Sequence, residues 1–228
     1  MHLSLRENEL KDYVGRQLQF NFPDKYSFKG NDVDIAFKYA LERTEWCFKH
    51  ITLNGYTNGK DANFSHLHSD QYSQFLYYLS NSLWKQSENK PICDKLIFLN
   101  KALNGIFYSY KAELPNIFLL GHPVGTIIGN ANYSDFLVIL QNVTINTDCD
   151  SNNNRAPKIG KGVFLGAGAK IIGNKPIGDR VSIGVNTMVY NKEIENDSIV
   201  YTNSMGNVEV IKRKKMCKAQ SYFNVPIE

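Results

Sequence analysis

The chain has 228 residues, of which 43% are hydrophobic and 21% are charged, and its formal net charge is +4. This balance excludes a disordered chain, and the charge is too small to require nucleic acid as a partner. No apolar run approaches the roughly 18 residues that a membrane helix needs. The first ten residues are too acidic and too interrupted for a signal peptide. We therefore expect a cytoplasmic protein with no membrane span and no nucleic-acid partner.

The first part of the chain has the composition and spacing of packed helices. Of the 28 aromatic residues, 21 lie in residues 1–120, whereas 11 of the 16 glycines follow that point. Apolar residues recur at helical spacing over residues 33–50, 70–86 and 92–108, which predicts three helices. Asp32 is placed to cap the first of these helices, and Ser69 or Asp70 to cap the second. We expect a helical N-terminal domain over residues 1–112.

A six-residue repeat dominates the second part of the chain. An aliphatic residue occupies every sixth position in this series: Ile159, Leu165, Ile171, Ile177, Ile183 and Val189. A period of six fits neither an α-helix nor a flat alternating strand. It fits a triangular parallel β-helix, in which three repeats complete one coil and the aliphatic residues stack inside the prism. The chain is therefore predicted to be of the α+β class.

The repeat region resembles the hexapeptide-repeat acyltransferases, and within them the serine acetyltransferases. The matching stretches are HPVGTIIG at 122–129, LQNVT at 140–144 and PKIGKGVFLGAGAKIIGN at 157–174. The resemblance implies a left-handed parallel β-helix over residues 113–210, followed by a basic C-terminal tail over residues 211–228. It also implies an acetyl-CoA-dependent O-acetyltransferase that needs no metal. Because the β-helices of this family share their active sites, it further implies a homotrimer or a dimer of trimers.

The same resemblance assigns roles to individual residues. His122 occupies the position of the family's general base, and neutral imidazole is suited to taking a proton from a hydroxyl group. Glu113 is the nearest candidate for the carboxylate that orients this histidine, although it lies nine residues upstream where the family has fifteen. The pantetheine arm of acetyl-CoA is expected along four positions: Gly166, Ala167, Ser182 and Val185.

The acceptor side of the predicted site departs from the family. Gly121 stands where the family has an aspartate, and Ala156 stands where it has a histidine. We therefore expect the acceptor to be a small molecule other than serine, and favour a sugar hydroxyl in surface polysaccharide biosynthesis. The residues expected to contact the acceptor are Arg155, Asp70 and His68. Serine O-acetylation in cysteine biosynthesis, an amino-sugar acceptor and a non-catalytic β-helix scaffold remain alternatives.

For two other clusters we favour a structural interpretation over a functional one. His66 and His68 have a spacing that binds metal in a strand, but no further Cys or His lies nearby, so a helix cap is preferred. A metal-dependent enzyme of the carbonic anhydrase type needs three histidines from adjacent coils, and only His122 lies in the repeat region. The basic run 212–215 is interpreted as a solvated tail, with contact to a ligand phosphate as the alternative.

Overall fold

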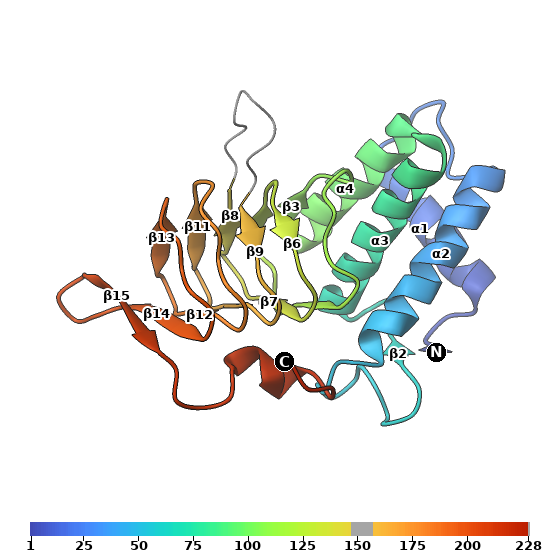
Figure 1. Ribbon diagram of the computed structural model, residues 1–228. Coiled ribbons are helices and arrows are strands. Elements are labelled where there is room, and N and C mark those ends of the chain that lie inside the picture. The colour runs from blue at the N-terminus through green and yellow to red at the C-terminus, as the bar shows by residue number, and fades with distance from the viewer. Residues whose placement is uncertain (147–156, 228) are drawn as a thin grey trace. The chain divides into compact units, whose positions relative to one another are not determined.

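The computed structural model describes residues 1–146 and 157–227, and it divides the chain into two compact units. The first unit comprises residues 1–49 and 53–111, and the second comprises residues 50–52 together with the chain from residue 112 onward. Helices form most of the first unit, and stacked parallel strands form the second (Figure 1).

The helical unit is built around one central helix. Its elements are α1 (Glu7–Asn21), α2 (Asn31–Phe48), α3 (Ser69–Ser87), α4 (Lys90–Asn104), β1 (His2–Leu3), β2 (Asn63–Phe64) and β3 (Phe107–Tyr108). α3 packs against both α2 and α4, and its residues from Phe75 to Leu79 are completely buried. β1 pairs in parallel with β2. Within the described residues, no helix combines the length and the apolar character needed to span a bilayer.

The three predicted helices are confirmed, but their ends differ from the prediction. α4 stops at Asn104, and not at residue 108, because Gly105 follows it with a left-handed backbone (φ 64°). Asp32 lies inside α2 and accepts hydrogen bonds from Ser87 and Asn89, so it does not cap that helix. The residue at the N-cap position of α3 is His68, whose side chain makes no capping hydrogen bond.

The second unit is a left-handed parallel β-helix with three faces. The first face contains β4 (Phe118–Leu120), β7 (Leu137–Ile139), β10 (Phe164–Leu165), β12 (Ser182–Ile183) and β14 (Ser198–Thr202). The second face contains β5 (Ile127–Ile128), β8 (Thr144–Ile145), β11 (Lys170–Ile172) and β13 (Met188–Tyr190). The third face contains β6 (Asn132–Tyr133) and β9 (Lys158–Ile159), continued by bridges from Ile159 to Ile177 and on to Ile194.

The six aliphatic residues of the predicted repeat form the column inside this prism. All six are at most 3% exposed. Leu165 pairs with Ile183 on the first face, Ile171 with Val189 on the second, and Ile159 with Ile177 on the third. The period of six in the sequence therefore corresponds to one side of a triangular coil, as predicted.

The corners of the coils are held by residues with left-handed backbones. Along the edge between the first and second faces, Gly125, Asn142, Gly168 and Asn186 occupy equivalent corner positions, all with positive φ. Asn186 Oδ1 lies 2.1 Å from the point where a Cβ on Gly168 would be. Glycine is therefore required at 168 both by its backbone angle and by the asparagine stacked on it.

The C-terminal segment packs on the outside of the first face. β15 (Val208–Lys212) pairs antiparallel with β14, and the 3-10 helix η1 (Lys218–Tyr222) follows it. Tyr222 stacks on Phe164 with ring centroids 5.9 Å apart, and Phe223 packs on Phe136 at 5.3 Å. Part of the segment predicted to be a basic tail, around Tyr222 and Phe223, therefore packs against the β-helix, while most of its other residues are exposed.

Candidate active site

His122 lies on a corner that is wider than the corners stacked on it. Leu120 and Ile127, which flank this corner, are seven positions apart in the sequence. Their strand partners in the next coil, Ile139 and Thr144, are only five positions apart. The stacked corners, 139 to 144, 165 to 170 and 183 to 188, take five steps each. The corner that carries His122 therefore contains two additional residues.

The backbone at this corner is fixed in an unusual conformation. His122 has a φ of 49°, and a left-handed backbone costs an ordinary L-residue about 1–2 kcal/mol. The Val124 N–H donates to the His122 carbonyl (2.7 Å), and Thr126 Oγ1 donates to the carbonyl of Leu140 in the next coil (3.1 Å). The His122 side chain itself is exposed. Strained residues of this kind are frequent at functional sites.

Three of the four predicted donor contacts lie on the same edge as His122. Successive coils are joined along this edge by a ladder of backbone hydrogen bonds. The N–H groups of Asn142, Gly168 and Asn186 donate to the carbonyls of Val124, Gln141 and Ala167, respectively, each at 2.8–2.9 Å. Gly166 and Ala167 belong to the third corner of this ladder, and Val185, 64% exposed, belongs to the fourth. A Cβ on Gly166 would lie 3.0 Å from the Ile183 carbonyl, so a small residue is needed there.

Ser182 does not lie on this edge. It is the first residue of β12 and pairs with Phe164, next to the inward-facing Ile183, so its side chain points out of the first face. It is 9% exposed. Because Tyr222 stacks on the neighbouring Phe164, this part of the face is close to the C-terminal segment. The predicted donor contact of Ser182 therefore has no support from its position.

Glu113 and His122 are not brought together. Glu113 precedes β4 and lines a cleft with Ser134, Asp135 and Lys161, at the edge between the third and first faces. His122 follows β4, at the edge between the first and second faces. The two residues thus flank opposite ends of the same strand, and the predicted orienting role of Glu113 is not supported by this arrangement.

His68 and Asp70, the predicted acceptor contacts of the helical unit, meet at the start of α3. Asp70 is 5% exposed and accepts a hydrogen bond from the Ser69 hydroxyl at 3.2 Å. The rings of His68 and Tyr56 are 5.6 Å apart, and both His68 Nδ1 and the Tyr56 hydroxyl are buried without a hydrogen-bond partner among the described residues. Burial, and then the charge of Asp70, raises the pKa of Tyr56. Sequence reasoning missed Tyr56, which carries no motif.

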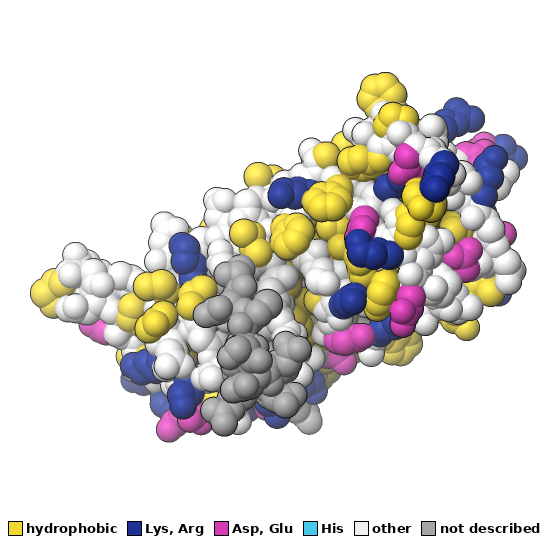
Figure 2. Space-filling view, turned by 90° about the horizontal axis from the view of Figure 1, so that it is seen from above, with side chains coloured by type: hydrophobic (Ala, Val, Ile, Leu, Met, Phe, Trp, Pro, Cys, Tyr) yellow, Lys and Arg dark blue, Asp and Glu magenta, His cyan; other side chains and the backbone are white. Residues whose placement is uncertain are grey.

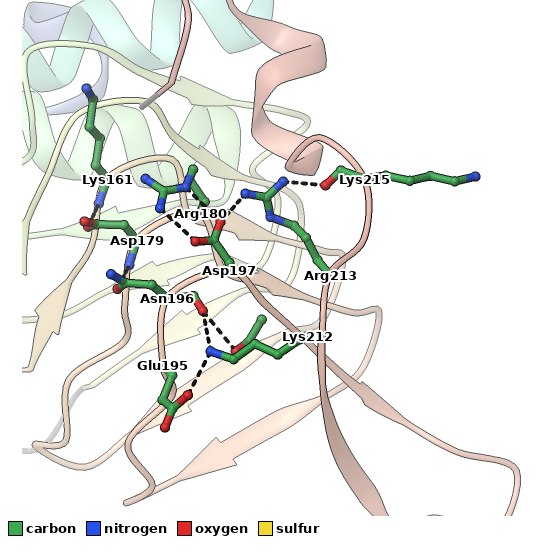
Figure 3. A network of polar contacts seen from close by, with 10 residues as sticks. Lys161, Asp179, Arg180, Glu195, Asn196, Asp197, Lys212, Arg213 and Lys215 are labelled. Carbon is green, nitrogen blue, oxygen red and sulfur yellow. Dashed lines mark hydrogen bonds and ion pairs between the residues drawn. The ribbon is translucent and has the colours of Figure 1, made fainter.

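Part of the basic C-terminal run is engaged in a polar network (Figure 3). Asp197 accepts two hydrogen bonds from Arg180, both at 2.8 Å, and a further one from Arg213. The hydrogen bonds from Arg180, more than those from Arg213, hold the pKa of Asp197 well below its usual range. Lys212 pairs with Glu195 at 2.8 Å. All three lysines of the run, Lys212, Lys214 and Lys215, are exposed.

Two further predictions concern metals and Arg155. Within the described residues, no three or more His, Cys, Asp or Glu side chains are grouped so as to hold a metal ion. His66 Nδ1 lies 2.8 Å from the Ser4 hydroxyl, within the helical unit. Arg155, the third predicted acceptor contact, lies outside the described residues.

Comparison with known proteins identifies relatives of the chain, although no protein-family model matches it. A serine acetyltransferase of Synechococcus elongatus is 30% identical over 119 residues, which are 51% of this chain and 48% of that protein. A serine acetyltransferase of Staphylococcus xylosus is 29% identical over 152 residues, or 66% and 68% of the two chains. The chain thus spans about half the length of the Synechococcus relative.

Solved structures show the same architecture. A serine acetyltransferase in complex with CoA superposes with a TM-score of 0.67 over 90% of this chain and 84% of the other, at 17% identity. At that identity the likeness concerns the fold. In fold and in the sequence of its matched region, the chain is therefore a homologue of the hexapeptide-repeat acyltransferases. Within that class, the relatives found are serine acetyltransferases.

Proposed function

We propose that the protein is an acetyl-CoA-dependent O-acetyltransferase with His122 as its general base. The observation that carries the proposal is the position of His122, exposed on a corner widened by two residues and on the same edge as Gly166, Ala167 and Val185. The corners stacked on it are shorter, and the third corner of the edge carries only small residues, Gly166, Ala167 and Gly168, so a thin pantetheine arm fits there. The relatives that share the matched region support the assignment.

The proposed reaction needs one proton-transfer group from this chain. The imidazole of His122 takes the proton of the acceptor hydroxyl as the hydroxyl oxygen attacks the thioester carbonyl of acetyl-CoA. The tetrahedral intermediate then collapses, the C–S bond breaks, and the proton passes from His122 to the departing thiolate. No nucleophilic serine or cysteine of the protein is required. Asp70, His68 and Arg155 remain our proposed acceptor contacts.

Serine is the acceptor that the relatives favour, against the sugar that the sequence analysis favoured. One observation keeps a sugar as the second candidate. At Gly121, where the family has an acid, a Cβ would lie 2.8 Å from Leu140 Cδ2. An acidic side chain there therefore requires Leu140 to turn away, and the present residues offer serine no carboxylate at this position.

A thiol-release assay separates the two acceptors. The protein is incubated with acetyl-CoA and either serine or a panel of glycosides and nucleotide sugars, and the specificity constants are compared. Serine O-acetylation predicts a specificity constant for serine at least about 100-fold above that of any sugar. A sugar that exceeds serine by the same margin would establish the second candidate, and no thiol release with any acceptor would favour the scaffold. The cytoplasmic location expected from the sequence remains part of this proposal.

A further inference from the structure

The cleft that Glu113 lines lies on the β-helix at the edge between its third and first faces, away from the edge of His122. Its volume is about 580 Å³, within the range of about 300–1,000 Å³ that is typical of ligand pockets. Its lining residues are Glu113, Leu114, Pro115, Asn116, Tyr133, Ser134, Asp135 and Lys161. All of them belong to the second unit. We refer to it as the Lys161 cleft.

The corners along this edge are built from a ladder of Asp and Asn side chains. Asp135 Oδ1 accepts a hydrogen bond from the backbone N–H of Ile117 at 3.0 Å. Two coils on, Asp179 Oδ1 accepts from the N–H of Lys161 at 2.8 Å, and in the following coil Asn196 Oδ1 accepts from the N–H of Asp179 at 2.8 Å. Each of these side chains therefore joins its own coil to the coil before it.

Lys161 interrupts the ladder. It occupies the corner position between Asp135 and Asp179, immediately before the left-handed residue Gly162. A lysine has no acceptor atom, so it cannot cap the preceding coil. Its side chain extends away from the polar network, with no dashed contact to its ammonium group (Figure 3). Lys161 therefore does not replace the coil-to-coil hydrogen bond that an Asp or Asn would make at this corner, and its ammonium group instead lies over the ring of Phe136.

The ammonium group of Lys161 is available to a ligand. It forms no ion pair with a described carboxylate, and the ring of Phe136 lies 5.5 Å from its Nζ. The Ser134 hydroxyl also makes no hydrogen bond to a described residue, although the Ser134 N–H donates to the Ile159 carbonyl at 3.0 Å. The cleft thus offers one cation and one hydroxyl as free hydrogen-bonding groups.

The rest of the lining supplies acceptors and a flat wall. Asp135 uses one oxygen for the Ile117 N–H, which leaves its second oxygen for a ligand. The Tyr133 hydroxyl donates to the Gly129 carbonyl at 2.7 Å, and Tyr133 lines the cleft together with Pro115 and Leu114. Hydroxyl groups of a ligand donate to carboxylates and accept from ammonium groups, while its C–H faces pack on aromatic and proline surfaces.

From this combination we propose that the Lys161 cleft binds a saccharide ring, separately from the site of acetyl transfer. A polyhydroxylated ring can donate hydrogen bonds to the carboxylate of Asp135 and accept them from the ammonium group of Lys161 within one cleft, whereas a simple anion would be repelled by that carboxylate. The proposal does not depend on the acceptor of the transferase reaction, because binding at this cleft needs no acetyl-CoA.

Saturation-transfer NMR on the full chain without acetyl-CoA tests the proposal. The probes are methyl glycosides of glucose, galactose, N-acetylglucosamine and glucuronic acid. We expect saturable binding of at least one probe, weakened about tenfold by Lys161→Ala, which removes a charge-assisted hydrogen bond. Asp135→Asn keeps the acceptor for the Ile117 N–H but removes the charge, and we expect it to weaken binding as well.

Matched controls separate a site from a general charge effect. Lys215→Ala removes an exposed lysine whose side chain points away from the cleft (Figure 3), and Glu193→Gln neutralises an exposed acid outside the cleft. Both controls should bind the probe as the unaltered chain does. Failure of all four probes to bind, or equal binding by Lys161→Ala and the unaltered chain, would overturn the proposal. Thiol release by the Lys161→Ala variant reports separately on the proposed transferase function.

Discussion

At the scale of single residues, His122 has the clearest consequence. Replacing it with Ala or Asn removes the group that we propose as general base, and general-base catalysis contributes roughly 10²–10⁴-fold to a rate. We expect turnover to fall by that factor in both variants. Binding of CoA, measured by calorimetry, should remain nearly unchanged, because the proposed donor contacts are other residues.

His2→Ala is the control for the loss of a histidine, since His2 is exposed and pairs only loosely with Asp61, at 3.7 Å. It should turn over at the unaltered rate. If His122→Ala folds normally and keeps full turnover, the assignment of this site is wrong.

The backbone of His122 leads to a second expectation. Glycine adopts a positive φ without steric cost, so His122→Gly should relieve the strain of a left-handed histidine (φ 49°). We expect the free energy of unfolding to rise by about 1 kcal/mol relative to His122→Ala, while turnover stays as low as in that variant. Urea denaturation checks the stability, and equal stability of the two variants would contradict the strain argument.

At the scale of elements, the stacked corners depend on glycine at 168. Gly168→Ala places a methyl group 2.1 Å from Asn186 Oδ1 on a backbone with φ of 71°. We expect a loss of about 1–3 kcal/mol in the free energy of unfolding. Gly206→Ala is the matched control, since it has a φ of 83° but open space around the added methyl group. A smaller loss at 168 than at 206 would show that the stacking does not matter.

The hydrogen bonds that join Asp197 to Arg180 and to Arg213, which follows β15, predict that the stability of the fold depends on pH. The pKa of Asp197 is lowered in the folded chain, so its contribution to stability is present above the unfolded value, about 3.9. It is lost as the pH falls below that value. Asp197→Asn should therefore be less stable than the unaltered chain at pH 7, and this difference should shrink below about pH 4. Denaturant midpoints at pH 7, 5 and 3 test this, and a difference independent of pH would contradict it.

The repeat predicted most of the β-helix because its determinants are local. Each aliphatic residue of the series from 159 to 189 is six positions from the next, and all are buried as expected. The packing of Phe223 on Phe136 was not predictable in this way, since the two rings come from distant parts of the sequence. The placement of Glu113 and His122 at opposite ends of β4 was missed for a related reason. The number of residues between them does not show on which edge of the β-helix each side chain lies. The widened corner could in principle have been found in the sequence, because two more residues precede Thr126 than a regular six-residue repeat would place there.

At the scale of the whole molecule, we expect the exposed apolar residues to mark the surface on which copies would associate. The outer side of the first face is covered by the chain's own C-terminal segment. The third face exposes polar residues such as Asn132 and Lys158. The second face exposes Ile127, Met188 and Tyr190 by 37%, 49% and 68%. Figure 2 shows hydrophobic side chains gathered toward the end of the β-helix that carries β14 and β15.

We therefore expect a homotrimer that uses the second face, and we expect Met188→Asp to dissociate it. Light scattering should give three times the mass of one chain for the unaltered protein and a smaller mass for this variant. Lys158→Asp, on the third face, is the control and should keep the trimer. A monomeric unaltered protein with full activity would refute this assembly.

Residues 50–52 pair with a C-terminal segment that is synthesised much later than they are. Ile51 bridges to Phe223, and the Thr52 hydroxyl donates to the Ser221 carbonyl, 169 residues further along the chain. At about 5–20 residues per second, the ribosome needs roughly 8–34 s to make that stretch. During this interval α1 and α2 are already complete, while Ile51, fully buried in the finished protein, has no partner strand. The nascent chain therefore leaves Ile51 without its C-terminal partner for many seconds, and residues 50–52 are a stretch that a chaperone would be expected to protect.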